Sequence, residues 1–147
     1  PMAATIMDNE LKKCGIEHMS VESRGLVVLF PEPYNPKAVA VAARHGMIIP
    51  SNEACQISDK DFGKDTLVLV MNQPMKAKVY ASFDRAINVY TIGEFTEDIE
   101  ADVEDPYGKG VEEYDRCFVQ LQNMIEKAAQ NIKKALDERA GKKEKKI

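Results

Sequence analysis

The chain has 147 residues, a length that suits one compact domain with its own core. Hydrophobic residues make up 44% of it, charged residues make up 30%, and the formal net charge is −4. This balance argues against a nucleic-acid or membrane-surface partner for the body of the domain. No apolar stretch is long enough to cross a membrane, and the opening residues lack the pattern of a signal peptide.

The three cysteines, Cys14, Cys55 and Cys117, are widely spaced along the chain. They form no Cys-x-x-Cys pair and no cluster with histidine, so we expect neither a disulfide framework nor a metal site. Free thiols of this kind favour a reducing, cytoplasmic setting. Nothing in the composition points to a cofactor.

The first predicted element is an amphipathic helix over residues 1–14. Pro1 suits a first helical turn because its missing N–H would have no intrahelical partner there, and Gly15 suits the helix end. The helix lacks an N-cap residue, which predicts that the chain begins inside a longer protein. Residues 19–23 are predicted to form a strand. The apolar run Leu26–Phe30 either extends a buried strand or forms an exposed hydrophobic wall or partner surface.

The rest of the chain alternates between helix and strand. Two short apolar runs predict buried parallel strands, and three amphipathic patterns predict helices. The strands are 66–71 and 87–91, and the helices are 35–46, 73–83 and 111–140. His45 stands directly before Gly46, where we expect a capping role. The alternation predicts a three-layer α/β/α domain with a mostly parallel sheet over residues 1–140, followed by a basic tail, 141–147.

Asp105-Pro106-Tyr107-Gly108 is the most distinctive stretch. It follows an acidic run and leads into the final helix. On residue types alone, Asp105 is either a solvated loop acid or an acid placed to give up a proton. In open α/β sheets, ligands bind outside the carboxyl ends of the strands, and this loop can reach that edge.

In their order and motifs, the elements resemble the low-molecular-weight protein tyrosine phosphatases from Pro1 to about Ile132. The most specific match is the 105–108 stretch, which is similar to the family's general-acid loop. Further matches are "PMAATIM" at the start of the first helix, "ESRG" ending at Gly25, and Asp65 with Met71 around a strand. The resemblance implies a flavodoxin-like sheet whose first strand is missing from this chain.

The resemblance also implies a chemistry. A cysteine thiolate would attack the phosphorus of a phosphorylated protein or a small aryl phosphate, and Asp105 would protonate the leaving oxygen. Tyr107 would line the substrate slot, while Pro106, Gly108 and Ser23 would fix loop geometry. If the apolar run forms a wall beside the site, Phe30 or Tyr34 would stack with the substrate. No metal and no cofactor take part.

The family's nucleophile lies in a loop of a cysteine, five residues and an arginine, directly before its first helix. None of the three cysteines here has an arginine six residues later. We therefore expect a chain that is truncated before this loop and inactive as given.

Several alternatives stay open. The chain could be a non-catalytic flavodoxin-like binding module, or a dimer, that uses the apolar region 26–34. It could also be a protein-arginine phosphatase, since the residues that discriminate between these substrates lie in the absent loop. An arsenate reductase is disfavoured because Cys55 stands alone in its segment. A calcium loop over residues 98–105 is disfavoured by the adjoining Pro106.

Overall fold

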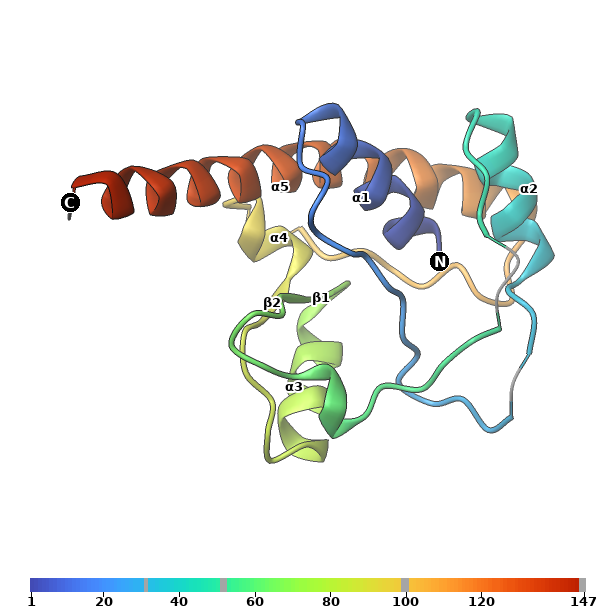
Figure 1. Cartoon of the computed structure of the whole chain (residues 1–147). Helices are drawn as coiled ribbons and strands as arrows, with labels where there is room; N and C mark the ends of the chain where they lie inside the picture. The colour runs from blue at the N-terminus through green and yellow to red at the C-terminus, as the bar shows by residue number, and fades with distance from the viewer. Residues whose placement is uncertain (31, 51–52, 99–100, 146–147) are drawn as a thin grey trace.

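The computed structural model describes residues 1–30, 32–50, 53–98 and 101–145, with side chains up to residue 140 (Figure 1). The helices are α1 (Met2–Lys13), α2 (Pro36–Arg44), α3 (Gln73–Ser82), α4 (Ile92–Phe95) and α5 (Val111–Lys145). The strands are β1 (Val68–Val70) and β2 (Val89–Thr91), and a short 3₁₀ turn spans Asp59–Asp61. The predicted helices are all present, and α4 is an element that the sequence did not predict. None of the described helices combines the length and apolar character needed to cross a membrane.

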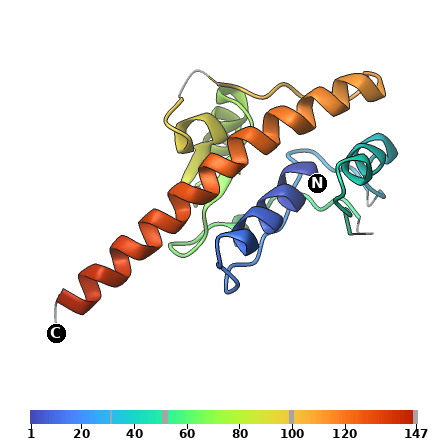
Figure 2. The same ribbon diagram turned by 90° about the horizontal axis from the view of Figure 1, so that it is seen from above.

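The long helix α5 organises the molecule. Figure 2 shows α1 and α2 on one side of it, with α3, α4 and the strands on the other. Its predicted apolar stripe is confirmed, because one face is buried along most of its length and forms the core with α1 and α2. The buried residues of that face are Tyr114, Cys117, Phe118, Leu121, Ile125, Ala128, Ala129 and Ile132. The helix continues to Lys145, past the predicted end near residue 140. The side chains of the predicted basic tail lie outside the described residues.

The two strands pair in parallel, with Val68 opposite Val89 and Val70 opposite Thr91. Helix α3 connects them, so β1, α3 and β2 form a parallel crossover unit. Val89 and Thr91 are buried while the side chain of Tyr90 between them is exposed, as the two-residue period of a strand requires. The α/β class and both of these strands are confirmed.

The strand predicted at 19–23 was wrong. Residues 17–24 take part in none of the backbone–backbone hydrogen bonds found among the described residues. The nearest pairing is a single parallel bridge between Gly25 and Gln56. A strand needs a partner for its N–H and C=O groups, and in this structure no neighbour supplies one along 19–23.

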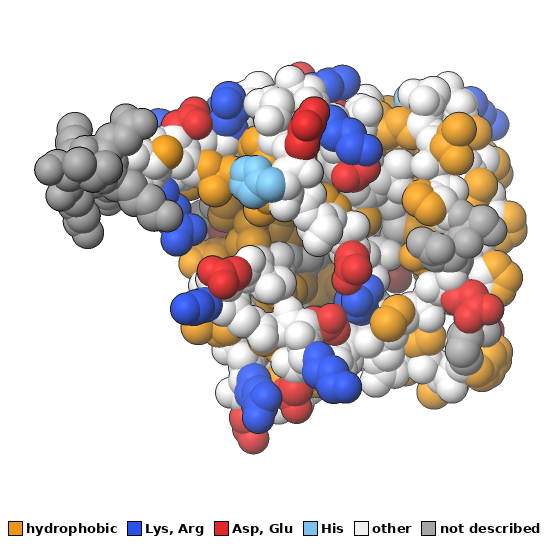
Figure 3. Space-filling model, in the orientation of Figure 1, with side chains coloured by type: hydrophobic (Ala, Val, Ile, Leu, Met, Phe, Trp, Pro, Cys, Tyr) orange, Lys and Arg blue, Asp and Glu red, His pale blue; other side chains and the backbone are white. Residues whose placement is uncertain are grey.

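The apolar run Leu26–Phe30 forms a loop, so the interpretation as an extended buried strand was wrong. The side chains of Val27, Leu29 and Phe30 are 76%, 86% and 61% exposed. The N–H of Val28 donates to the side-chain oxygen of Gln56 at 3.1 Å. This bond holds the loop at one point, in place of the row of backbone hydrogen bonds that a strand would make. In Figure 3, hydrophobic side chains are exposed on the side of the molecule that carries α2 and this loop.

The ends of α2 follow the sequence. The Asn35 side chain accepts a hydrogen bond from the Lys37 N–H at 2.9 Å, and Pro36 occupies the first turn. His45 is the C-cap, as expected, and Gly46 adopts a φ of +77°, in the left-handed region that favours glycine. The beginning of α2 lies next to the loop that precedes α5, where Lys37 Nζ donates to the Lys109 carbonyl.

Candidate functional site

The segment 102–110, called here the acid loop, joins the α4 region to α5. Its anchor is Val103, whose side chain is only 1% exposed. The Val103 N–H donates to the carbonyl of Met71 at 2.8 Å, and Met71 directly follows β1. The acid loop therefore passes the carboxyl end of β1, where the sequence predicted that it could reach.

Asp105 begins a tight turn within this loop. Its Oδ1 accepts a hydrogen bond from the Tyr107 N–H at 3.0 Å, and the Pro106 carbonyl accepts one from the Lys109 N–H at 3.0 Å. Gly108 has a φ of +81°, a conformation that costs little only for glycine. The proline and the glycine together fix the backbone geometry of the turn that Asp105 begins.

The acid loop and the first turns of α5 enclose a hollow of about 310 Å³. Four carboxylates and two cationic side chains line it, so its charge is predominantly negative. The lining residues are Asp102, Glu104, Asp105, Pro106, Lys109, Glu113, Arg116, Cys117 and Gln120. The Asp105 side chain is exposed at this hollow, where it can meet a molecule from solution.

Cys117 reaches the same hollow from α5, but its side chain is 8% exposed. Burial, and then the negative charge of Asp105, raise the pKa of the Cys117 thiol. A raised pKa keeps the group as a neutral thiol, whereas a nucleophilic cysteine needs a lowered one. The raised pKa therefore disfavours Cys117 as a nucleophile.

Lys37 connects α2 to the acid loop. Its Nζ donates to the Lys109 carbonyl at 2.6 Å and lies 5.9 Å from the centre of the Tyr114 ring. Burial raises the pKa of the Tyr114 hydroxyl, and the charge of Asp105 adds to the effect. Lys37, at the beginning of α2, thus contacts both the acid loop and the Tyr114 ring of α5.

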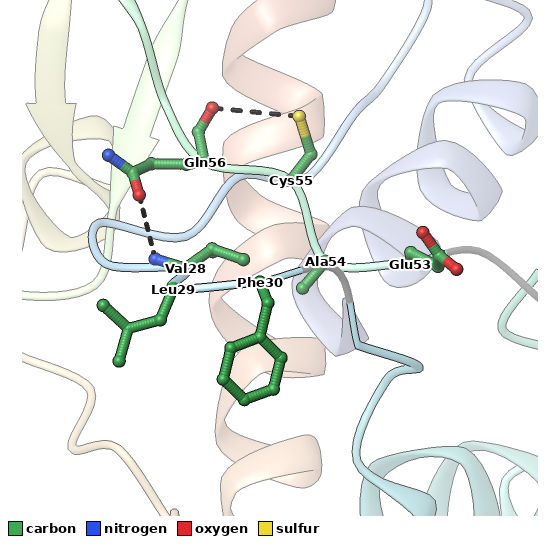
Figure 4. Close-up of a pocket in the computed structure, with 7 residues that line it drawn as sticks. All are labelled: Val28, Leu29, Phe30, Glu53, Ala54, Cys55 and Gln56. Carbon is green, nitrogen blue, oxygen red and sulfur yellow. Dashed lines mark hydrogen bonds between the residues drawn. The ribbon is translucent and has the colours of Figure 1, made fainter.

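The predicted substrate contacts Tyr107, Phe30 and Tyr34 do not share one hollow, and Ser23, predicted to fix loop geometry, lies beside Tyr34. The Ser23 hydroxyl lies 3.3 Å from the Tyr34 hydroxyl, so the structure brings these two together. Phe30 lines a different hollow, of about 460 Å³ (Figure 4). That hollow shares no lining residue with the one at Asp105. Tyr107 is 77% exposed on the turn and lies outside both sets of lining residues.

Sequence reasoning missed several residues that contact the acid loop, among them Lys37, Asn72, Cys117 and Gln120. Asn72 carried a readable signal, because an asparagine before Gln-Pro is a typical N-cap. Cys117 and Gln120 carried none, since polar side chains three residues apart on a long helix are common. Within the described residues, no group of three or more His, Cys, Asp or Glu side chains is placed to hold a metal ion.

The family model described as low molecular weight phosphotyrosine protein phosphatase matches residues 1–141. The helices and the parallel strands described above agree with that match. The chain belongs to this family.

Curated relatives and solved structures agree. The chain is 29% identical to the low molecular weight protein-tyrosine-phosphatase PtpB of Staphylococcus haemolyticus, over 76% of this chain and 79% of the relative. It is 27% identical to the probable phosphatase EpsP of Ralstonia solanacearum, over 82% and 81%.

Among solved structures, the low molecular weight protein tyrosine phosphatase from T. tengcongensis has a TM-score of 0.79 at 28% identity, covering 88% of each chain. The YwlE arginine phosphatase from Geobacillus stearothermophilus has a TM-score of 0.78 at 22% identity, covering 94% of this chain and 87% of that one. This second likeness establishes the flavodoxin-like fold and nothing further.

Proposed function

We propose that residues 1–140 supply the general-acid side of a phosphomonoester hydrolase site, with Asp105 as the acid. The observation that carries the proposal is the placement of Asp105. It stands on a turn fixed by Pro106 and Gly108, at a hollow beside the carboxyl end of β1.

The three cysteines are free thiols, which suits a protein that acts in the cytoplasm.

The chemistry needs two proton transfers at Asp105, one in each half of the reaction. A cysteine thiolate attacks phosphorus and the bond from phosphorus to the leaving oxygen breaks, while the Asp105 carboxyl group gives its proton to that oxygen. The carboxylate then takes a proton from a water molecule that attacks the phosphocysteine. The bond from phosphorus to sulfur breaks as water adds, inorganic phosphate leaves, and the thiolate and the protonated Asp105 are restored.

In this proposal the attacking thiolate is none of the three cysteines in these 147 residues. None of Cys14, Cys55 and Cys117 is followed by an arginine six residues later. Phosphate binding needs such a loop, with an arginine and a cradle of backbone N–H groups. The substrate class that fits is a phosphorylated protein or a small aryl phosphate. Phosphotyrosine is the first choice because of the family, and phosphoarginine is the alternative.

The test uses the natural protein as its gene encodes it, including any residues upstream of Pro1. Asp105→Asn keeps the shape of the side chain but removes the proton. Turnover should fall by roughly 10²–10⁴, the usual worth of general acid catalysis. The loss should be greatest for alkyl phosphates, whose departing oxygen most needs a proton, and smaller for nitrophenyl phosphate. KM should change little, because Asp105 does not hold the phosphate.

Glu112→Gln is the matched control. Glu112 is an exposed acid in the first turn of α5 and does not line the hollow. Its variant should turn over both substrates like the wild type. Equal effects of the two substitutions, or no turnover by the natural protein, would overturn the proposal. Parallel assays on phosphotyrosine and phosphoarginine peptides decide the substrate class.

The exposed apolar loop favours a second candidate function, self-association. Leu29 and Phe30 protrude beside a hollow that Val28 and Ala54 also line (Figure 4). A second copy related by a two-fold axis would cover the same loop on both chains at once. Sedimentation at increasing concentration should detect a dimer that Leu29→Ser abolishes. A monomer at all concentrations would exclude it.

A further inference from the structure

The backbone that leads into Asp105 is held in an unusual way. Residues 102–104 belong to no strand, and among the residues that the structure describes a single backbone–backbone hydrogen bond, from Val103 to Met71, connects them to another part of the fold. Side chains donate hydrogen bonds to the backbone carbonyls of all three residues. Gln120 Nε2 donates to the Asp102 carbonyl at 3.3 Å, Asn72 Nδ2 to that of Val103 at 3.2 Å, and Cys117 Sγ to that of Glu104 at 3.9 Å.

The three donors come from rigid elements. Cys117 and Gln120 lie one turn apart on the same side of α5, three residues apart in sequence. Asn72 is the N-cap of α3, and its side-chain oxygen accepts from the Met75 N–H at 3.0 Å. That bond orients the amide so that its nitrogen faces the loop. Two helices therefore set the position of the segment directly before Asp105.

We propose that Gln120, Asn72 and Cys117 are positioning residues that hold the entry to Asp105 in the geometry that proton transfer needs. The inference rests on the proposed role of Asp105. A general acid must lie within hydrogen-bond reach of the leaving oxygen, and a small displacement of the acid has a large effect on the rate. Cys117 remains a protonated donor because burial raises the pKa of its thiol.

Three variants separate this role from a general loss of stability. Gln120→Met keeps the length of the side chain and adds no charge, but removes the donor. Cys117→Ala removes the thiol, and Cys117→Ser restores a hydrogen-bond donor at the same place. Gln130→Met is the matched control, since Gln130 is also exposed on α5 and makes none of the acid-loop contacts.

The first readout is amide hydrogen exchange in the 147-residue chain, normalised to the amide of Ile125 in the core of α5. Loss of one hydrogen bond should speed exchange at the Val103 and Tyr107 N–H groups by about fivefold. Gln120→Met and Cys117→Ala should show this change, Cys117→Ser should show less of it, and Gln130→Met should match the wild type. Unchanged exchange at both groups would overturn the inference.

The second readout is the ratio of turnover on nitrophenyl phosphate to turnover on an alkyl phosphate, in the natural protein. A displaced acid raises this ratio, whereas partial unfolding lowers both rates equally. Gln120→Met and Cys117→Ala should raise it in the same direction as Asp105→Asn, by a smaller factor. If Asp105→Asn raises the ratio and these variants do not, the inference fails while the proposed function stands. If Asp105→Asn leaves the ratio unchanged, the proposed function fails, and the inference fails with it.

Discussion

His45 Nε2 lies 2.8 Å from Asp115 Oδ1, and this contact joins the end of α2 to the second turn of α5. The imidazole ring also stacks on Phe118, with the ring centres 4.5 Å apart and the planes 14° apart. The residue that caps α2 through its backbone thus uses its side chain to attach α2 to the core helix. Both side chains are partly buried, which strengthens the contact relative to a surface pair.

We predict that the His45–Asp115 contact contributes measurably to stability. In a double-mutant cycle with His45→Ala and Asp115→Ala, the coupling free energy of unfolding should be about 0.5–1.5 kcal/mol. His45→Ala alone should cost more than Asp115→Ala, because it also removes the stacking on Phe118. Urea unfolding at one fixed pH measures all four proteins. The exposed pair Lys133–Asp137 is the control cycle, where a coupling of about 0.5 kcal/mol or less is expected.

Glu94 should make stability depend on acid pH. Lys76 Nζ donates to both of its carboxylate oxygens, at 2.8 and 3.0 Å, and Gln73 Nε2 donates at 2.9 Å. These bonds, those of Lys76 first, lower the pKa of Glu94 from 4.5 to about 2. The carboxylate therefore stabilises the fold fully above pH 4.5, and the contribution is lost as the pH falls towards 2.

Glu94→Gln tests this dependence. The variant should be less stable than the wild type at neutral pH, by roughly 1–2 kcal/mol after screening by solvent. The difference should shrink between pH 4.5 and 2, as the wild-type carboxylate becomes protonated. Urea midpoints from pH 7 down to pH 2 give the comparison. A difference that stays constant over this range would show that Glu94 does not carry the dependence.

Gly93→Ala should destabilise the protein. A Cβ atom at this buried position would lie 2.5 Å from the carbonyl oxygens of both Asp98 and Ala101. Because backbone atoms are in the way, the loop before the acid loop would have to move, at a cost of about 1–3 kcal/mol. Gly63→Ala is the control, since its nearest neighbour would be 3.9 Å away. There the smaller entropy of the unfolded chain should leave stability unchanged or slightly raised. Thermal unfolding should therefore show a lowered midpoint for Gly93→Ala and no lowering for Gly63→Ala.

The 147-residue chain by itself should not hydrolyse nitrophenyl phosphate above background. Covalent catalysis needs a thiolate, and the only cysteine at the acid loop, Cys117, has a raised pKa. Intact mass must confirm the length of the protein assayed. Turnover that survives Cys117→Ala would show that another group in these residues acts as the nucleophile.

Local signals were enough for much of the fold. Caps and apolar periods predicted α1, α2, α3 and α5, and short β-branched runs predicted β1 and β2. The Asp105–Gly108 motif predicted the turn that the structure shows, because a proline and a glycine at fixed spacing act on the backbone nearby. The strand predicted at 19–23 was wrong because a strand depends on a distant partner and not only on local signals. Alternation gives a segment the propensity to form a strand, but only a neighbour across the sheet supplies the hydrogen bonds.

The sequence by itself predicted the α/β class, most of the helix ends and the turn at Asp105–Gly108, since these follow from local caps, apolar periods and turn residues. The tertiary structure alone decided that Leu26–Phe30 is exposed and that Phe30 lies in a separate hollow from Asp105. It also decided that Asn72, Cys117 and Gln120 converge on three neighbouring carbonyls. These contacts join segments from 13 to 31 residues apart, as the sequence separations of the hydrogen bonds show. Such contacts form only when packing brings the segments together, so no local pattern encodes them.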